Sequence, residues 1–206
     1  MKKEVEEMQF ISERQIILAS GSPRRRELLG VLGLPIKVLP SNVEENVELI
    51  DKDFNDYVQK LAVKKAAAVA NMKPDAVVIA ADTIVVFKDE VYPKPATKEQ
   101  AETFLKTFSG KAHSVFTGVS ILGGGKEIVF SEETKVVFKE LDDKLIKAYV
   151  DSGDPMDKAG GYGIQTAGVL LVDKIEGDYS NVVGLPLAKL VEILRRERII
   201  QLKEGE

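Results

Sequence analysis

A β-hairpin predicted near the middle of the chain constrains the fold more than any other feature. Residues 114–122 and 127–139 are rich in valine, isoleucine, phenylalanine and threonine, and three consecutive glycines, Gly123 to Gly125, join them. Such runs on either side of a short glycine turn are typical of two antiparallel strands. Helical and strand patterns alternate along the rest of the chain. The sequence therefore disfavours an all-parallel sheet and predicts a mixed α/β sheet with helices packed on it.

Length and composition indicate one folded unit. A chain of 206 residues is long enough to bury a sizeable core. Its composition, with 44% hydrophobic and 30% charged residues, is typical of a soluble globular protein. We expect residues 1–13 to be an N-terminal extension, residues 14–200 to form a single α/β domain and residues 201–206 to be a C-terminal tail. No apolar segment resembles a signal peptide or reaches the length of a membrane-spanning helix, so we expect a cytoplasmic protein without a membrane partner.

The charged and reactive residues exclude several kinds of site. A net charge of −4 disfavours broad binding to nucleic acid, which normally needs a basic surface. The chain has no cysteine, which excludes disulfides, thiol nucleophiles and cysteine-ligated zinc. His113 is the single histidine, so a histidine-rich metal centre is disfavoured and His113 is assigned a structural role. Any bound metal is expected to be a hard ion such as Mg²⁺, held by carboxylates.

The segment from residue 16 to residue 29 has the order strand, tight turn and helix. An apolar run ends in a turn that contains Ser20 and Ser22, and Pro23 suits the first position of the following helix. Arg24 and Arg25 then lie in the first helical turn, where positive charge opposes the helix dipole. A bound phosphate would relieve this conflict, because free N–H groups and guanidinium groups would converge on it. The alternative interpretation, a solvated basic face, has similar weight from this segment alone.

Asp82 stands out in the next predicted strand. Every position from residue 76 to residue 87 is apolar except Asp82 and Thr83. A buried carboxylate costs several kcal/mol unless it meets a cation, a metal or hydrogen-bond donors. Asp82 is therefore the best single candidate for catalysis, with a turn-capping aspartate at the end of a strand as the alternative.

Other charged residues occupy positions that suit a site. Lys65 continues the apolar stripe of a helix predicted over residues 54–72, which favours either a bound anion or a side chain that reaches out to solvent. Glu44 and Glu45 are adjacent in an extended segment, so only one of them can point into a site. Lys94 lies between two prolines, which stiffen the backbone around its charge.

A glycine-rich loop over residues 157–165 precedes the last predicted elements. Three glycines surround Tyr162, so the backbone can approach a ligand while the ring and the amide of Gln165 remain to recognise it. A nucleobase would suit this loop, and a flexible hairpin turn is the alternative. A strand is predicted over residues 169–174 and a final helix over residues 186–196.

Taken together, six motifs resemble the Maf family of nucleoside triphosphate pyrophosphatases and occur in the order found in that family. The resemblance extends from about residue 16 to residue 194 and rests on residues 18–25, 44–45, 61–66, 81–85, 94–95 and 157–165. It implies an elongated mixed sheet of the Maf and inosine-triphosphatase type, with a cleft between two lobes. It also implies hydrolysis of a nucleoside triphosphate between its α and β phosphates, with a divalent metal. Mg²⁺ is the expected ion, and Mn²⁺ and Co²⁺ are alternatives.

The resemblance also implies a role for individual residues. The loop that ends at Gln165 looks like the branch of the family that prefers dTTP and UTP. It departs from several relatives at Gly161 and Thr166, changes that remove no functional side chain. Asp82 matches the proton acceptor of the family and Glu45 an acidic position, and both are expected to hold the metal. The implied substrate-binding residues are Ser20, Arg24, Arg25, Lys65, Thr83, Lys94 and Gln165.

Some expectations concern the whole protein. The resemblance implies a nucleoside triphosphate as the partner, a homodimer as the expected assembly, and a link to septum formation. Two other classes of function remain open from the residues themselves. A phosphatase or nucleotidyltransferase could use the same polyphosphate site, and a non-catalytic nucleotide sensor would bind the triphosphate without turnover.

Overall fold

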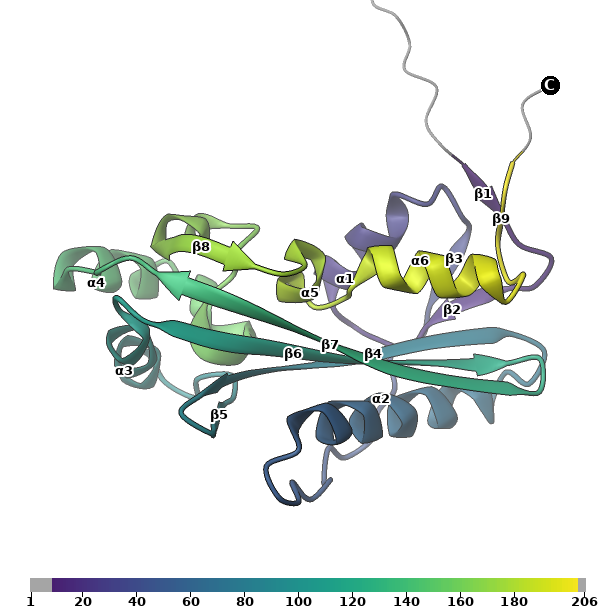
Figure 1. The fold of residues 1–206 in the computed structure, drawn as a ribbon, viewed down its shortest axis with the longest axis horizontal. Coiled ribbons are helices and arrows are strands. Elements are labelled where there is room, and N and C mark those ends of the chain that lie inside the picture. Colours follow the sequence, from purple (N-terminus) through teal and green to yellow (C-terminus); the bar gives the residue numbers. More distant parts are fainter. Residues whose placement is uncertain (1–8, 204–206) are drawn as a thin grey trace, which may run out of the picture.

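The predicted hairpin forms the two longest strands of the molecule. The computed structural model describes residues 9–203, and in it β6 (Ala112–Gly123) and β7 (Lys126–Phe138) run antiparallel from Ala112 opposite Val137 to Gly123 opposite Lys126. A third long strand, β4 (Val77–Phe87), pairs with β6 along the other edge. These three strands extend along the long axis of the molecule and connect its two ends (Figure 1).

The complete sheet is mixed, as the sequence predicts. The strand order is β3 (Ile36–Val38), β2 (Ile16–Leu18), β4, β6, β7 and β8 (Val172–Glu176), and β5 (Glu90–Tyr92) also pairs with β4. β2 is parallel to both β3 and β4, whereas all other pairs in this sheet are antiparallel. The expectation of an elongated mixed α/β sheet is therefore confirmed.

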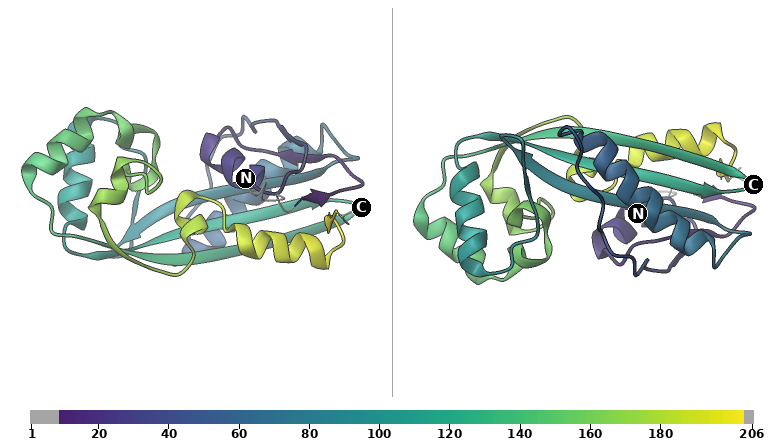
Figure 2. Two further views of the ribbon diagram at one scale, coloured as in Figure 1. Left: turned by 90° about the horizontal axis from the view of Figure 1, so that it is seen from above. Right: turned by 90° about the horizontal axis from the view of Figure 1, so that it is seen from below.

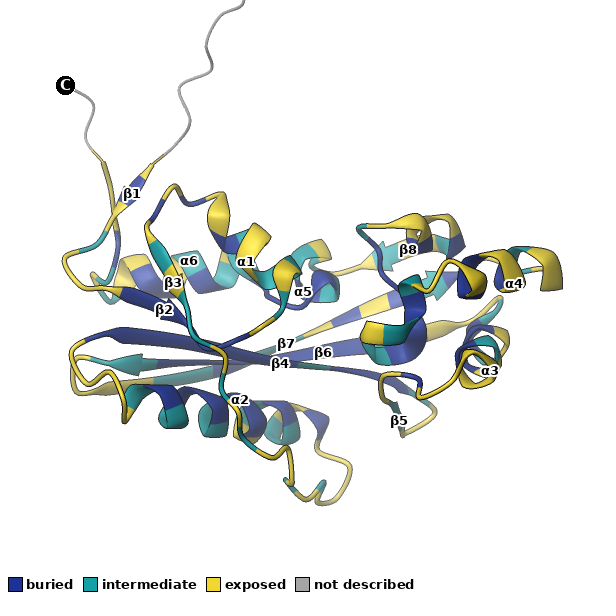
Figure 3. Ribbon diagram, turned by 180° about the vertical axis from the view of Figure 1, so that it is seen from behind, coloured by how far each residue is buried: buried dark blue, intermediate teal, exposed yellow. Residues whose placement is uncertain are grey.

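Helices cover both faces of one end of the sheet. α1 (Pro23–Gly30) and α6 (Leu187–Arg196) lie on one face and α2 (Phe54–Ala70) lies on the other (Figure 1). Strand β4 contributes side chains to both faces of the sheet, because successive side chains of a strand point to opposite faces. Its residues Val77 and Ile79 belong to the core shared with α1 and α6, and Val78 and Ala80 belong to the core shared with α2. The central strands are accordingly buried along most of their length (Figure 3).

A second lobe forms at the other end of the long strands. It contains α3 (Lys98–Phe108) and α4 (Asp143–Asp151), and it stands apart from the α1 and α6 lobe when seen from above (Figure 2). Its core includes Phe108 and Phe138, with the His113 ring stacked on Phe108 at a centroid distance of 4.5 Å. The structural role predicted for His113 agrees with this position.

Local sequence signals predict the helix starts well. Ser22 caps α1 by accepting a hydrogen bond from the Arg25 N–H, and Pro23 is the first helical residue. Asp53 caps α2 and Thr97 caps α3, each through a backbone N–H three residues ahead. Each cap satisfies a backbone donor that lacks a partner within the helix, which is why these residue types occur there.

The prediction for residues 169–174 is partly wrong. Ala167–Leu171 forms a 3₁₀ helix, η3, and β8 begins only at Val172. Val169 and Leu170 are exposed there, so their apolar character does not reflect burial in a strand. The chain turns tightly after the glycine-rich loop, and the Val169 N–H donates to the Thr166 carbonyl at 3.1 Å. This tertiary constraint overrides the strand preference of the residues.

The sequence also missed a short helix and a small sheet. α5 (Tyr179–Val183) precedes α6, and β1 (Phe10–Ile11) pairs antiparallel with β9 (Gln201–Leu202). The β1–β9 pair joins segments predicted to be an N-terminal extension and a C-terminal tail, whose residues 1–8 and 204–206 lie outside the described part. The division at residues 13 and 200 stays a prediction. None of the helices in residues 9–203 has the length and apolar character needed to cross a membrane.

Candidate active site

Asp82 and Thr83 lie where one edge of strand β4 has no neighbour. β2 pairs with β4 only as far as Ile79, and β5 pairs with it only from Val85 onwards. On the opposite edge β6 pairs without a break through this stretch. The side chains of Asp82 and Thr83 point to opposite faces of the strand, and both line the cavity that opens at the free edge.

Almost all the site residues predicted from the sequence line this cavity. Its volume is about 400 Å³, and residues of both lobes line it. The predicted site residues on its wall are Arg24, Arg25, Glu45, Lys65, Asp82, Thr83, Lys94 and Gln165. Ser20 is the exception: it does not line the cavity, and its Oγ accepts hydrogen bonds from two residues that do, Arg25 Nη1 and the Ser22 N–H.

Lys65 and Asp82 form a buried ion pair. Asp82 is 7% exposed and Lys65 is 9% exposed, and the Lys65 ammonium group donates a hydrogen bond to Asp82 Oδ1. The pairing requires close packing of α2 on the sheet. Gly118 lies opposite Asp82 on β6, and a Cβ atom there would come within 2.3 Å of the Val58 backbone. A glycine at this position therefore lets α2 bring Lys65 to Asp82.

Glu45 joins this pair from the segment before α2. Its Oε1 lies 2.8 Å from the Lys65 ammonium nitrogen, whereas Glu44 is exposed and accepts a hydrogen bond from Asn46. Of the two adjacent glutamates, Glu45 lines the cavity and Glu44 does not. Partial burial would raise the pKa of Glu45, but the hydrogen bond and charge of Lys65, together with Lys94 and Arg25, outweigh burial and hold this pKa below its usual range.

Arg25 is fixed by three protein acceptors. Its Nε donates to the Gly184 carbonyl at 2.7 Å, Nη1 to Ser20 Oγ at 3.2 Å and Nη2 to Thr83 Oγ1 at 2.9 Å. Burial lowers the pKa of Arg25 and the negative charge of Asp82 raises it, but a guanidinium stays protonated in proteins. All three contacts are to uncharged groups. The full positive charge is therefore held rigidly at the cavity wall.

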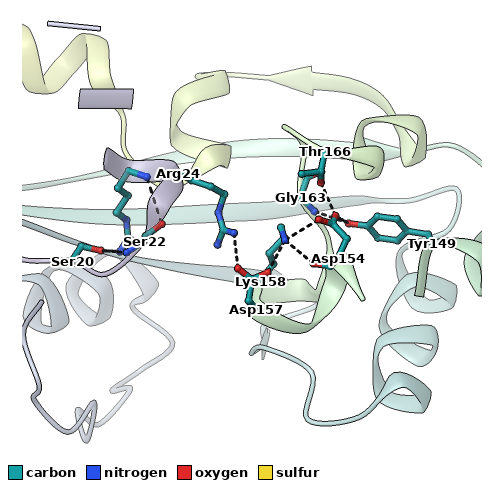
Figure 4. Close-up of polar contacts among 10 residues, drawn as sticks. Ser20, Ser22, Arg24, Tyr149, Asp154, Asp157, Lys158, Gly163 and Thr166 are labelled. Atoms are coloured by element: carbon teal, nitrogen blue, oxygen red, sulfur yellow. Dashed lines mark hydrogen bonds and ion pairs between the residues drawn. The ribbon is translucent and has the colours of Figure 1, made fainter. Parts of the chain in front are cut away.

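Arg24 reaches across the cavity to the second lobe. Its Nη1 donates to Asp157 Oδ2 at 2.9 Å, and Asp157 Oδ1 accepts from Lys158 Nζ at 2.6 Å (Figure 4). Asp157 ends a short 3₁₀ helix, η1 (Asp154–Asp157), at the start of the glycine-rich loop. The loop and helix α1 are thus connected by an ion pair, and the neighbouring Arg26 is exposed.

The glycine-rich loop forms the far end of the cavity. Its Gly160 N–H donates to the Pro93 carbonyl at 3.2 Å, which ties the loop to the exposed Lys94 segment. Tyr162 points into the second lobe, where its hydroxyl pairs with His113 Nε2 at 2.8 Å. The side-chain oxygen of Gln165 is buried at the cavity and has no hydrogen-bond partner within residues 9–203. It is an acceptor available to a ligand.

Sequence reasoning missed three contributors to the site. Tyr57 lines the cavity, and it lies four and eight residues before Leu61 and Lys65, so the helical spacing could have found it. Gly184 supplies a carbonyl from the C-terminal end of α5, an element that the sequence did not predict. Lys158 is 7% exposed and pairs with Asp154 and Asp157, which no sequence pattern indicates.

The arrangement has three chemical parts. A pair of carboxylates, Asp82 and Glu45, meets at one ammonium group, the positive charges line the adjacent wall, and a buried amide acceptor lies in the loop. Within residues 9–203 no cluster of three or more acidic or histidine side chains could hold a metal alone. The donor set fits a Mg²⁺ ion that takes one or two carboxylates from the protein and its other ligands from a phosphate and water.

Known proteins provide an independent comparison. The family described as Maf-like protein matches residues 15–197. A dTTP/UTP pyrophosphatase of Bacillus anthracis (strain CDC 684 / NRRL 3495) is 47% identical over 186 residues, which cover 90% of this chain and 97% of the relative. One of Thermosipho africanus (strain TCF52B) is 48% identical over 192 residues, covering 93% and 98%. Among solved structures, the Staphylococcus aureus Ham1 protein aligns with 61% of this chain and 72% of its own, at 16% identity and a TM-score of 0.43. The matched residues span nearly the whole described chain, and the chain belongs to the Maf-like protein family.

Proposed function

We propose that this protein hydrolyses dTTP and UTP to the nucleoside monophosphate and pyrophosphate. The observation that carries the proposal is the single cavity in which a buried carboxylate, Asp82, adjoins fixed positive charge and a free amide acceptor. The relatives named dTTP/UTP pyrophosphatase support it, because they match almost the whole chain.

Four cations suit the polyphosphate group. A triphosphate with a bound Mg²⁺ still carries roughly two negative charges, which guanidinium and ammonium groups stabilise. Arg25 provides a rigid charge, Arg24 and Lys65 provide charges now paired with carboxylates, and Lys94 provides an exposed one. The same groups would stabilise the charge that develops on the departing pyrophosphate.

Asp82 is the proposed general base. Its carboxylate is buried next to the cationic wall, where it can orient a water molecule and accept its proton. Lys65 contacts Asp82 and Glu45 together, so it keeps two like charges close to each other. Glu45 is the more exposed of the two carboxylates and is proposed as their partner in holding the metal.

A divalent cation completes the proposed site. Asp82 and Glu45 would hold Mg²⁺ jointly with the substrate, and Mn²⁺ or Co²⁺ could replace it. When bound, the cation neutralises phosphate charge. The protein's own contribution is to supply the two carboxylates and to keep Lys65 between them.

The loop explains a preference for uracil and thymine. Both bases present an N3–H donor between two carbonyl acceptors, and the side-chain amide of Gln165 offers an acceptor next to a donor. Its buried oxygen would gain the hydrogen bond that it lacks. Thr83 and Ser20 are proposed to act through Arg25, because both hold its guanidinium.

Product analysis tests the reaction class. Incubated with UTP and Mg²⁺, the protein is expected to release UMP and pyrophosphate in equal amounts, resolved by ion-exchange chromatography. UDP with orthophosphate would indicate a phosphatase, and a uridylylated acceptor would indicate a nucleotidyltransferase. Binding of UTP without any product would indicate a nucleotide sensor. Each of these three results contradicts the proposal.

The proposal includes the setting in which the enzyme acts. We propose a cytoplasmic enzyme that acts on free nucleotides rather than on nucleic acid. We also propose that it assembles as a homodimer and that its activity is linked to septum formation. Light scattering measures the assembly directly, and a mass close to that of one 22.6 kDa chain would contradict the homodimer.

A further inference from the structure

Gln165 sits within a tight turn. The Thr166 N–H donates to the Gly163 carbonyl at 3.3 Å, so Ile164 and Gln165 occupy the two central positions of a four-residue turn. Ile164 is buried and lines the cavity beside Gln165. An amide that recognises a base needs a fixed backbone, because a misplaced side chain leaves buried polar groups unpaired.

Both ends of this turn are attached to the same pair of side chains. At its start, the Gly163 N–H donates to the Tyr149 hydroxyl at 3.0 Å. At its end, the Thr166 hydroxyl donates to Asp154 Oδ2 at 2.6 Å. Tyr149 and Asp154 are themselves joined, since the Tyr149 hydroxyl donates to the same Oδ2 atom at 2.5 Å (Figure 4). Both hydroxyl groups thus share Asp154 Oδ2 as an acceptor, and the Tyr149 oxygen still accepts from Gly163. The Thr166 hydroxyl also lies 2.8 Å from the Gly163 carbonyl oxygen, a second acceptor within the turn itself.

Lys158 is the third side chain that contacts Asp154. Its ammonium group donates to Asp154 Oδ1 at 3.1 Å and to the Asp154 carbonyl at 2.6 Å. Burial would raise the pKa of Asp154, but the hydrogen bonds from Thr166, Tyr149 and Lys158 outweigh burial and lower it. The turn also packs on the Lys158 side chain, because a Cβ atom at Gly163 would lie 2.4 Å from Lys158 Cε. The Asp154 carboxylate is therefore held in place by Lys158 and in turn anchors the Gly163–Thr166 turn.

We propose that Tyr149, Asp154 and Thr166 are positioning residues that hold Gln165 at the cavity and so control binding of the nucleoside end of the substrate. The inference rests on the proposed function, which assigns that end to Gln165. The polyphosphate wall comes from other elements, namely α1, α2 and the Lys94 segment. Loss of the positioning contacts should therefore weaken binding of the nucleoside and leave binding of the polyphosphate unchanged.

Binding of the two products separates the two ends. UMP and pyrophosphate are titrated separately by calorimetry, with Mg²⁺, into the whole protein and into Thr166→Val and Tyr149→Phe. Each variant loses one hydroxyl group, so UMP affinity is expected to fall about five- to tenfold, while pyrophosphate affinity stays within about twofold. Steady-state kinetics with UTP should show the same rise in KM and a smaller change in kcat.

Two matched variants serve as controls. Thr166→Ser keeps the hydroxyl group and is expected to restore most of the UMP affinity that Thr166→Val loses. Thr107→Val makes the same chemical change on α3, away from the turn, where the hydroxyl of half-buried Thr107 donates to the Thr103 carbonyl at 2.8 Å. It is expected to leave both affinities unchanged.

The outcomes separate the inference from the proposed function. If the unaltered protein binds both products but Thr166→Val and Tyr149→Phe leave UMP affinity unchanged, or weaken pyrophosphate equally, the positioning role is wrong. If the unaltered protein releases no UMP and pyrophosphate from UTP, the proposed function is wrong and the inference falls with it. Thr166 is exposed, so Thr166→Val should fold, and its comparison with Thr166→Ser decides the matter if Tyr149→Phe does not fold.

Discussion

At the scale of single residues, burial distinguishes the two carboxylates of the site. Asp82 is 7% exposed on a strand, whereas the Glu45 side chain is 61% exposed in an extended segment. Both contact Lys65, but only Asp82 lies on a strand whose neighbouring residues, Ala80 and Ala81, are packed in cores on opposite faces of the sheet. A proton acceptor must be held close to its target, which favours Asp82 as the base and Glu45 as its partner.

Asp82→Asn tests this assignment. The variant keeps the size of the side chain and its ability to contact Lys65, but the amide cannot accept a proton from water. We expect kcat for UTP to fall by about 10² or more, the usual contribution of a general base, with the thermal unfolding midpoint little changed. Glu44→Gln is the control, because it removes one negative charge from an exposed neighbour of the site. Near-normal turnover in Asp82→Asn would show that another group accepts the proton.

At the scale of elements, His113 shows how a buried strand residue couples stability to pH. Its imidazole lies on β6 between Phe108, Phe138 and Tyr162, and burial lowers its pKa to about 3. The unfolded chain has a histidine pKa near 6.5, so it binds a proton that the folded protein does not. The stabilising contribution is therefore complete above pH 6.5 and is lost as the pH falls from 6.5 towards 3.

This difference predicts a measurable loss of stability in mild acid. The chain has one histidine, and carboxyl groups titrate mainly below pH 5, so most of the effect between pH 7 and pH 5 is assigned to His113. The free energy of unfolding, measured with urea, should be about 2 kcal/mol lower at pH 5 than at pH 7. The imidazole signals in NMR spectra of the folded protein should not titrate over the same range. A titration midpoint near pH 6.5 would refute the buried, neutral imidazole.

The elements also show what could be read from the sequence. The long hairpin and the capped helices follow local patterns, so glycine turns, β-branched runs and residues such as Ser22 and Asp53 were enough to predict them. The η3 helix, α5 and the β1–β9 pair depend on contacts between distant segments, which local patterns do not contain. The candidate site divides in the same way. Its charged residues stood out, whereas the Gly184 carbonyl and the Tyr149–Asp154 pair required the fold.

At the scale of the whole molecule, the site depends on both lobes. Helices α1 and α2 bring Arg24, Arg25 and Lys65 to the free edge of β4, and the glycine-rich loop of the second lobe lines the same cavity. The long strands run from one lobe to the other, and the Arg24–Asp157 ion pair connects the lobes across the cavity. In the proposed function, this arrangement places the polyphosphate and the base at opposite ends of the cavity, which is the basis for expecting selection among nucleotides.

The central claim is that one cavity selects pyrimidine triphosphates and splits them into monophosphate and pyrophosphate. The most direct measurement is kcat/KM for pyrophosphate release from dTTP, UTP, dATP, ATP, dGTP and GTP, each with Mg²⁺. We predict that dTTP and UTP are the best substrates and that the four purine nucleotides are turned over poorly. A preference for a purine triphosphate, or the absence of pyrophosphate from every reaction, would contradict the claim.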